Sequence, residues 1–378
     1  MPTPAITKPT NPTTPTPPTA PPQSPARWRF RLVTKSALKR IAVAALVLIA
    51  CAGAALWYCT AMPGTSFRGT LPASTPAQQL LAARLETHVR YLAGEVGARS
   101  TYYPRKGGLA ARYIREQLLA AGYTAVNETF VERGARVPNL EVVLAGADPT
   151  LPCVVIGAHY DSYQGSPGAD DNASGTAAVI ELAHQLKAMA ALHPTGAFAE
   201  RTIRLVLFVN EEPPAFQTAD MGSWVYAKDL KARGVAVSAM VSLESIGYYR
   251  TEPGSQKYPV PGLNLLYPNE GDFVAIVGNL QSRALVRECV GAFRAAAKFP
   301  CEGASLPNSV PGVGWSDHWA FWQEGHSAVM VTGTAPFRNP HYHTSTDLPD
   351  TLDYDRLARV TEAMAAVAGQ LAGKLATK

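Results

Sequence analysis

The sequence predicts one large α/β domain with a largely parallel sheet, preceded by a segment that does not belong to it. From about Pro72 onward, helical and strand-like segments alternate, which is typical of α/β domains. Several strand-like segments are followed directly by His, Asp or Glu, as expected where parallel strands present ligands at one edge of a sheet. The first 62 residues, by contrast, contain no acidic residue. We therefore do not count these 62 residues as part of the α/β domain.

Residues 1–40 are predicted to form a disordered cytoplasmic tail. Pro and Thr dominate residues 1–26, a composition that cannot bury a core. Basic residues then cluster between Arg27 and Arg40. Residues 1–40 carry seven basic and no acidic residues, a charge of +7. Because the net charge of the whole chain is +5, the rest of the chain has a net charge of −2. Binding to nucleic acid therefore has no support.

Residues 41–62 are predicted to be a transmembrane signal anchor. This uncharged stretch would be roughly 33 Å long as a helix, which matches a bilayer core. The basic residues before it place the tail in the cytoplasm and everything after Met62 in the periplasm or outside the cell. Two alternatives stay open: a lipoprotein whose mature chain begins at Cys51, and a cleaved secretory signal peptide.

Residues 63–75 are predicted to be a linker, and residues 76–378 the folded domain. Helices are predicted over Gln78–Leu92, over Leu109–Ala121 with Gly122 at the C-cap, from near Ser174, from near Ser316, and over Tyr354–Leu375. Strands are predicted at Ala125–Val131, Leu140–Leu144, Cys153–Ala158, Ile203–Val209, Val235–Leu243, Phe273–Val277 and Ala328–Thr332.

Two other features of this domain can be read from the sequence. Tyr248–Asp272 is rich in Pro, Gly and Tyr and is predicted to be a long functional loop. Cys289 and Cys301 are the one plausible disulfide pair, although free thiols are the favoured interpretation.

Candidate metal ligands follow four of the predicted strands, and an Asp pair follows the first of them. They are His159, Asp170 and Asp171, Glu211 and Glu212, Glu244, and His343. Two imidazoles with several carboxylates suit Zn²⁺, and a carboxylate can bridge two ions roughly 3.5–4 Å apart. The spacing alone leaves open which Asp is the bridge.

The adjacent pair Glu211 and Glu212 is expected to divide two tasks. Neighbouring side chains in extended backbone point in opposite directions, so one should bind an ion while the other takes a proton from water. Asp161, two residues after His159, is expected to accept the second N–H of that imidazole. Together these residues indicate a hydrolase.

Six motifs resemble the co-catalytic zinc exopeptidases of the bacterial leucyl aminopeptidase and glutamate carboxypeptidase type. They are AHYDS, GADDNASG, FVNEE, LESIG, WSDHWAFW and FRNPHYHTSTD, and the resemblance extends from roughly Arg84 to Gly373. It implies a three-layer sandwich of the phosphorylase/hydrolase-like type with a mixed, largely parallel sheet. It also implies two Zn²⁺ ions as cofactors and peptides as substrates.

The same resemblance implies a role for each site residue. The metal ligands would be His159, Asp171, Glu212, Glu244 and His343, with Asp171 as the bridge. Glu211 would be the general base, and Tyr342 would hydrogen-bond the tetrahedral intermediate. A cis peptide is expected after Asp171. Glu244 stands where many aminopeptidases have Asp, a difference that concerns specificity rather than hydrolysis.

Several other side chains near the motifs have both structural and functional interpretations. His341 is expected to be an ordinary loop residue. Asp317 and His318 would either cap the helix that begins nearby or line the substrate pocket. The aromatic residues of WSDHWAFW are expected in the core, with Phe321 as a candidate for the pocket.

The predicted function is a membrane-anchored zinc aminopeptidase that removes N-terminal residues from peptides. A carboxypeptidase needs a cation for the substrate carboxylate, whereas an aminopeptidase needs acidic groups for the ammonium. Arg338 is the one obvious cation near the motifs, against Asp170, Glu211, Glu244 and Asp317. Two alternatives share the scaffold: a glutaminyl cyclase-like enzyme with one zinc, and a non-catalytic binding ectodomain. The latter would be expected to lose ligands, and all five are present.

Overall fold

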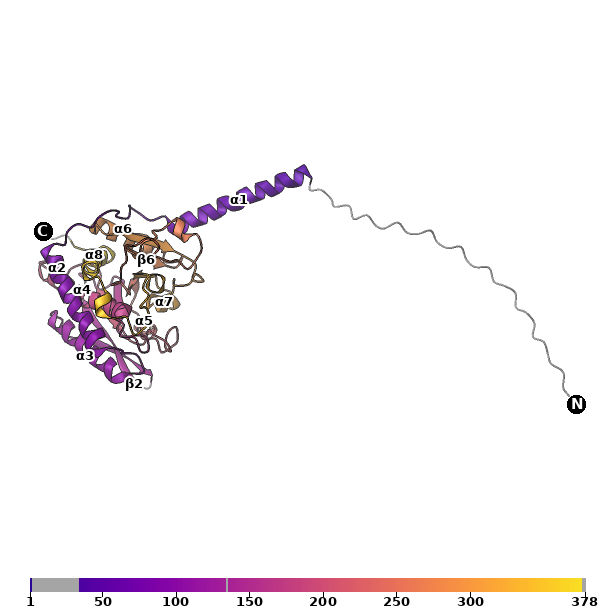
Figure 1. Cartoon of the computed structure of the whole chain (residues 1–378). Coiled ribbons are helices and arrows are strands. Elements are labelled where there is room, and N and C mark those ends of the chain that lie inside the picture. The colour runs from indigo at the N-terminus through magenta and orange to yellow at the C-terminus, as the bar shows by residue number, and fades with distance from the viewer. Residues whose placement is uncertain (2–33, 134, 376–378) are drawn as a thin grey trace. The chain divides into compact units, whose positions relative to one another are not determined.

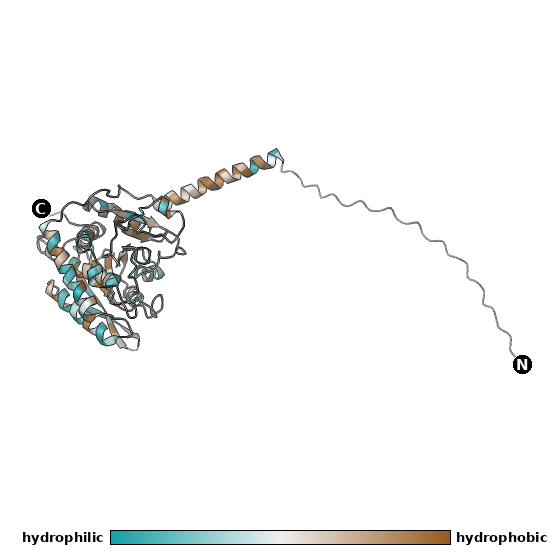
Figure 2. Ribbon diagram, in the orientation of Figure 1, coloured by the Kyte–Doolittle hydropathy of each residue, from teal (hydrophilic) through white to brown (hydrophobic). Residues whose placement is uncertain are grey.

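A computed structural model describes residue 1, residues 34–133 and residues 135–375, so most of the predicted tail lies outside the described residues. The chain divides into two compact units, residues 1–53 and 54–378. Helix α1 (Lys35–Thr60) begins in the first unit and is apolar along most of its length (Figure 2). It is long and apolar enough to cross a membrane. A signal sequence has the same properties.

The second unit holds the sheet and its helices. The helices are α2 (Pro76–Val89), η1 (Arg90–Val96), α3 (Pro104–Ala120), η2 (Ala169–Ser174), α4 (Gly175–Ala191), α5 (Gly222–Ala232), η3 (Leu263–Leu265), α6 (Arg283–Ala296), α7 (His318–Gln323), η4 (Ala335–Phe337), η5 (Pro349–Thr351) and α8 (Tyr354–Ala372). The strands are β1 (Asn127–Arg133), β2 (Ala135–Leu144), β3 (Cys153–His159), β4 (Ile203–Phe208), β5 (Val237–Glu244), β6 (Val274–Gly278), β7 (Cys301–Ser305) and β8 (Ala328–Thr332).

One eight-stranded sheet runs through this unit (Figure 1), in the order β1-β2-β4-β3-β5-β8-β6-β7. The four central strands β4, β3, β5 and β8 are parallel to one another, and so are β6 and β7. Antiparallel pairs join β1 to β2, β2 to β4, and β6 to β8. The predicted mixed, largely parallel sheet is therefore confirmed.

The sheet lies between two layers of helices, and the alternation along β3 shows why. Val154 and Ile156 point to a core shared with α4, α6 and α8. Cys153 and Val155 point to the opposite face, where residues of α5 and α7 cover them. Because side chains alternate along a strand, burying both faces requires helices on both sides. The predicted three-layer sandwich is confirmed.

One part of the second face is covered differently. β6 and β7 pack against α6 on one side, whereas side chains from the Tyr248–Asp272 segment line a pocket with Ala275, Val277 and Ala304 on the other. In the described part of this segment the only helical element is the short η3. The predicted long loop is thus present, and it covers this face of the sheet at β6 and β7.

Two α-helices and one strand, α5, α6 and β7, were not predicted from the sequence. Strand β7 has the sequence CEGAS, and Glu and Gly are depleted in strands. Its Glu302 is paired with Arg68 and Arg294, which offsets the burial of a carboxylate. Cys289 and Cys301 are buried free thiols, as favoured.

Candidate active site

The predicted site residues converge at one edge of the sheet because of the order of the strands. After β3 the chain forms β4 on one side of it and then crosses to form β5 on the other. Such a switch point opens a crevice at the carboxyl ends of parallel strands. His159 is the last residue of β3 and Glu244 the last of β5. Their side chains meet in that crevice, where His159 Nε2 lies 3.2 Å from Glu244 Oε2.

A first group of possible metal ligands consists of His159, Asp171 and Glu244, all of them buried. Asp171 belongs to the turn η2, which follows the loop after β3. Its Oδ1 lies 3.3 Å from His159 Nε2. The peptide bond after Asp171 is cis, as predicted.

A second group consists of Asp171, Glu212 and His343. The other oxygen of Asp171, Oδ2, lies 3.1 Å from His343 Nε2, and Glu212 Oε2 lies 3.3 Å from the same nitrogen. Asp171 therefore faces both groups with different oxygen atoms. The donor atoms within each group lie within 4.8 Å of one another. Two imidazoles and three carboxylates in this arrangement fit a pair of Zn²⁺ ions.

Electrostatics also fit the binding of cations here. Burial raises the pKa of Glu212 to about 8, and the nearby Asp171 carboxylate adds to the rise. Burial alone would lower the pKa of His343, but hydrogen bonds to Asp171 and Glu212 outweigh it and raise the pKa to about 10. In addition, Glu212 Oε1 is buried without a hydrogen-bond partner among the described residues. A buried carboxylate oxygen left unpaired is costly, and a bound cation would remove that cost.

Glu211 and Glu212 contact different histidines, but they lie in the loop after β4 rather than in the extended strand on which the prediction depended. Glu212 reaches His343, whereas Glu211 Oε2 lies 3.8 Å from His159 Nε2. Burial, reinforced by the neighbouring Glu212 and Glu244 carboxylates, raises the pKa of Glu211 well above its usual range. Glu211 belongs to neither ligand group, so its carboxylate is left beside the site.

Asp161 supports the site in a way that differs in part from the prediction. Its carboxylate lies 3.6 Å from His159 Nδ1, whereas its own backbone carbonyl is closer to that nitrogen, at 3.2 Å. The carboxylate instead accepts hydrogen bonds from the backbone N–H groups of Glu211 and Glu212, at 3.1 and 3.2 Å. Asp161 therefore ties the end of β3 to the loop after β4.

Two further groups that hold the site were not assigned a role from the sequence. Ser245 Oγ and Ser316 Oγ donate to the two oxygens of Glu244, at 2.7 and 2.8 Å. Arg99 is almost fully buried, and its guanidinium donates to the backbone carbonyls of Tyr160 and Gly168, at 2.6 and 2.9 Å. It thereby fixes the loop between His159 and Asp171. An isolated Arg outside all the motifs gave no signal of this role.

The profile of Peptidase family M28 matches residues 139–368, a range that includes both ligand groups and Glu211. The chain belongs to peptidase family M28. The predicted family and the predicted class of enzyme, a metallo-exopeptidase, are therefore confirmed.

Two curated proteins are similar to this M28 peptidase over most of its length. The uncharacterized protein YfbL of Escherichia coli (strain K12) is 37% identical over 287 residues, which cover 74% of this chain and 85% of YfbL. A probable leucine aminopeptidase of Arthroderma otae is 24% identical, covering 73% of this chain and 66% of the fungal protein.

Solved structures share the fold at lower sequence identity. The Legionella pneumophila LapA aminopeptidase is 20% identical, with a TM-score of 0.60 over 82% of this chain and 78% of its own. The zinc aminopeptidase BSAP of Bacillus subtilis is 15% identical, with a TM-score of 0.56 over 82% and 98%. A glutaminyl cyclase of Bacteroides thetaiotaomicron is also 15% identical, with a TM-score of 0.55 over 79% and 98%.

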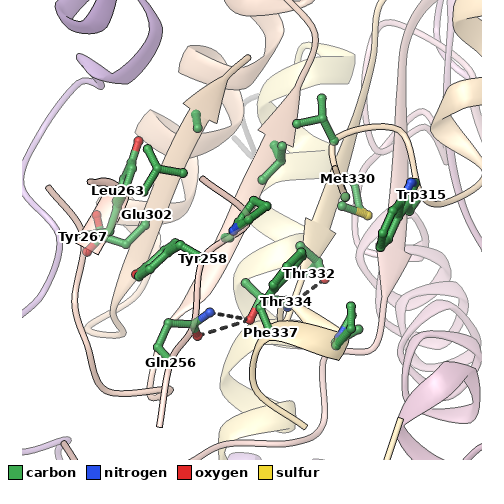
Figure 3. A pocket seen from close by; sticks show the side chains of 18 of the residues that line it. Gln256, Tyr258, Leu263, Tyr267, Glu302, Trp315, Met330, Thr332, Thr334 and Phe337 are labelled. Carbon is green, nitrogen blue, oxygen red and sulfur yellow. Dashed lines mark hydrogen bonds between the residues drawn. The ribbon is translucent and has the colours of Figure 1, made fainter. Parts of the chain in front are cut away.

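A pocket of about 850 Å³ that is open to solvent reaches Glu244, a member of the first ligand group of this M28 peptidase. Glu244 and Tyr342 line one part of it, and the Tyr342 ring stacks on that of His343. Figure 3 shows Leu263 and Tyr267 at one end and Trp315 at the other. Most of the lining is apolar or aromatic, as in sites for organic ligands.

The structure corrects the expected roles of three residues near the pocket, namely Asp170, Asp317 and Trp315. The Asp170 carboxylate accepts hydrogen bonds from the backbone N–H groups of Gly247 and Tyr248 and from the Asn339 amide, so it is not available to a substrate ammonium. Asp317 neither lines the pocket nor caps α7 with its side chain. Phe321 is in the core, whereas Trp315 lines the pocket.

Arg338 is also fully engaged within the protein. Its guanidinium donates to Gln256 Oε1, to the Tyr248 carbonyl and to the Phe273 carbonyl, at 3.0, 3.3 and 2.8 Å. The side chain is buried and does not line the pocket. His341, as expected, is a loop residue, hydrogen-bonded to the Thr346 hydroxyl.

Proposed function

We propose that this M28 peptidase is a two-zinc aminopeptidase that hydrolyses the first peptide bond of a substrate. The supporting observation is the pair of ligand groups that share Asp171, with Glu211 beside them but in neither. One ion would be held by His159, Asp171 and Glu244, and the other by Asp171, Glu212 and His343. Three protein ligands at each ion leave room for water and substrate.

In this proposal the residues of the chain divide the steps of hydrolysis. Zinc ions bound at these ligands would polarise the scissile carbonyl and lower the pKa of a water molecule. Glu211 accepts a proton from the attacking water and then gives it to the leaving amine. Tyr342 donates a hydrogen bond to the carbonyl oxygen as it gains charge. Burial among the site carboxylates raises the pKa of Tyr342, so its hydroxyl remains a donor.

Recognition of an amino terminus is favoured over recognition of a carboxyl terminus. A carboxypeptidase requires a free cation in the pocket. Arg338 is engaged by three protein acceptors and does not line the pocket, so the cation of the pocket lining is the exposed Lys257. Glu244 lines the pocket, and Glu211 lies near it. A substrate ammonium would find two carboxylates beside the proposed ions, whereas for a substrate carboxylate the pocket lining offers one cation, Lys257.

The glutaminyl cyclase alternative has weaker support. Such an enzyme would use one zinc, whereas both ligand groups have all their members here. The non-catalytic ectodomain is disfavoured for the same reason, since the proposed base and all five ligands are present.

We further propose that α1 is an uncleaved membrane anchor and that the peptidase domain lies outside the cytoplasm. The apolar helix and the basic residues before it support this arrangement. Protease added to intact cells or spheroplasts should digest the domain, and the protein should stay with membranes after high-salt washing. A mature N-terminus at Cys51 would instead establish a lipoprotein.

The test of the proposed activity compares substrates that differ only at their ends. The full chain should hydrolyse aminoacyl amides and fail on the N-acetylated forms, with two zinc ions per chain by metal analysis. Release of C-terminal residues from N-blocked peptides would make it a carboxypeptidase. One tightly held zinc together with cyclisation of N-terminal Gln would make it a cyclase.

A further inference from the structure

The segment that follows the apolar helix is held on α6 by a row of arginines. Arg283 donates to the carbonyl of Tyr58 at 2.6 Å, and its guanidinium lies 4.0 Å from the centre of the Tyr58 ring. Arg287 donates to the carbonyl of Ala61, and Arg294 to that of Pro63 at 3.0 Å. The last carbonyls of a helix have no partners within it. Arg283 supplies such a partner for Tyr58, while Arg287 and Arg294 bind residues just beyond the helix. Together they fix the end of α1 against α6.

The contact continues along the edge strand β7. The backbone N–H of Cys301 donates to Ser66 Oγ at 3.1 Å, and Arg68 pairs with Glu302 at 2.8 Å. Met62 packs beside Gly303, where an added Cβ would lie 3.0 Å from Met62 Cγ. Residues 58–68 are thus bound to the domain rather than acting as a free spacer. The α6–β7 edge must therefore remain next to the end of the apolar helix.

That end carries the residues expected at a membrane surface. Trp57 and Tyr58 are 68% and 47% exposed, and Trp and Tyr are enriched where a span meets water. Because Arg283 is stacked on Tyr58, it would lie at the level of the lipid phosphates. Arg287, one turn further along α6, is also partly exposed.

A second exposed apolar segment lies in the same region. Residues 259–268, PVPGLNLLYP, contain no charge, and Leu265 and Leu266 are 84% and 46% exposed. The Tyr267 hydroxyl next to them donates to the carbonyl of Gly303 in β7 at 2.8 Å. Met62, just after α1, also packs beside Gly303, so this loop and the end of the apolar span meet at the same residue of β7.

We propose that the loop 259–268 is a membrane-docking element. Leu265 and Leu266 enter the boundary between head groups and acyl chains, while Arg283 and Arg287 face the lipid phosphates. This inference depends on the proposed membrane anchor. The bilayer is the occupant favoured by the structure, because the apolar span ends beside the loop and brings it to the lipid surface. Adjacent apolar and basic groups are what an interfacial element requires.

The docking element also forms a wall of the substrate pocket. Leu263 and Tyr267 line the pocket (Figure 3), whereas Leu265 and Leu266, between them in the chain, do not. One turn therefore presents one set of side chains to the substrate and another to the bilayer. The pocket consequently opens close to the lipid surface, and its substrates are peptides with apolar N-terminal ends that collect there.

The docking is tested with the full chain in its own membrane. A photo-crosslinking amino acid replaces Leu265 and, as a matched control, Leu192, which is 80% exposed. Leu192 precedes β4, which is five positions from β7 in the sheet. Position 265 should form lipid adducts at least about tenfold more often than position 192. Equal yields at the two positions, or adducts of position 265 with a protein, would overturn the proposal.

Anchoring and docking can fail separately. If the chain leaves the membrane on carbonate washing, the anchor proposal fails and the docking proposal with it. If the chain is retained and position 265 shows no excess of lipid adducts, docking alone is wrong.

A second experiment measures the effect on activity. The double variant Leu265→Asp, Leu266→Asp should cleave a peptide tethered to vesicles by a C-terminal acyl chain about tenfold more slowly. Its rate on a soluble aminoacyl amide should match that of the unmodified chain and of Leu192→Asp. An unchanged rate on the tethered peptide would show that docking does not bring the pocket to its substrates.

Discussion

Substituting Gln for one or the other of the two adjacent glutamates separates the proposed base from the proposed ligand. The Glu211 carboxylate makes no hydrogen bond among the described residues, and its ion-pair partner there is His159, whose Nε2 lies 3.8 Å from Glu211 Oε2. Glu211→Gln keeps the shape of the side chain and removes no ligand. We expect both zinc ions to remain and kcat to fall by roughly 10² to 10⁴, which adds about 2.7–5.5 kcal/mol to the activation free energy.

Glu212→Gln should behave differently because Glu212 Oε2 lies 3.3 Å from His343 Nε2, within a ligand group. Zinc should fall from two ions to about one per chain. Metal analysis after dialysis, kcat on an aminoacyl amide and the melting temperature should be measured for both variants. Loss of zinc from Glu211→Gln, with full metal in an inactive Glu212→Gln, would reverse the two assignments. Retained activity in Glu211→Gln would refute the role of a base.

Three further predictions concern the groups around the ligands. Ser316→Ala removes a donor to Glu244 and should lower zinc affinity about 10- to 100-fold; Ser305→Ala, whose buried hydroxyl has no described partner, is the control. The raised pKa of His343, about 10 without metal, means that its proton must leave when zinc binds, so apparent zinc affinity should rise between about pH 6 and 8. A flat zinc titration over that range would contradict this. Arg99→Met should lower the unfolding free energy by about 3 kcal/mol in urea titrations, because it leaves buried carbonyls unpaired.

The elements predicted correctly are those in which the hydrophobic pattern of the sequence matches the burial of the residues in the fold. β8 has the predicted bounds, Ala328–Thr332, and all its residues are buried and apolar or β-branched. The missed β7 depends on partners far away in the sequence, since Arg68 neutralises Glu302. α6 is different, because its buried Leu285, Cys289 and Phe293 recur at helical spacing. That pattern can be read from the sequence when the window begins at Arg283.

The candidate site was predictable to the extent that its chemistry is local. Each proposed ligand lies in a motif at the end of a strand or soon after it, and the strand order then brings the motifs together. The sequence does not show which protein groups each polar side chain is hydrogen-bonded to. Arg338 and Asp170 are near the site, as expected, but backbone and side-chain partners engage both. A sequence shows that a charge is present but not which partners have already neutralised it.

Whether a charged side chain is already paired within the protein decides whether it can recognise the amino or the carboxyl terminus of a peptide. A count of charges near the motifs includes Asp170 and Asp317 among the acids and Arg338 as the cation, yet none of the three lines the pocket. Without these three residues, Glu211 and Glu244 remain near the proposed ions, and Lys257 is the cation of the pocket lining. The bias toward an ammonium therefore comes from carboxylates that are themselves the proposed base and a proposed ligand. Glu244→Gln should consequently affect zinc binding and amine recognition together, whereas Glu211→Gln should leave the zinc count unchanged. If neither variant changed the preference for a free amine over an N-acetylated one, recognition would have to come from elsewhere in the pocket.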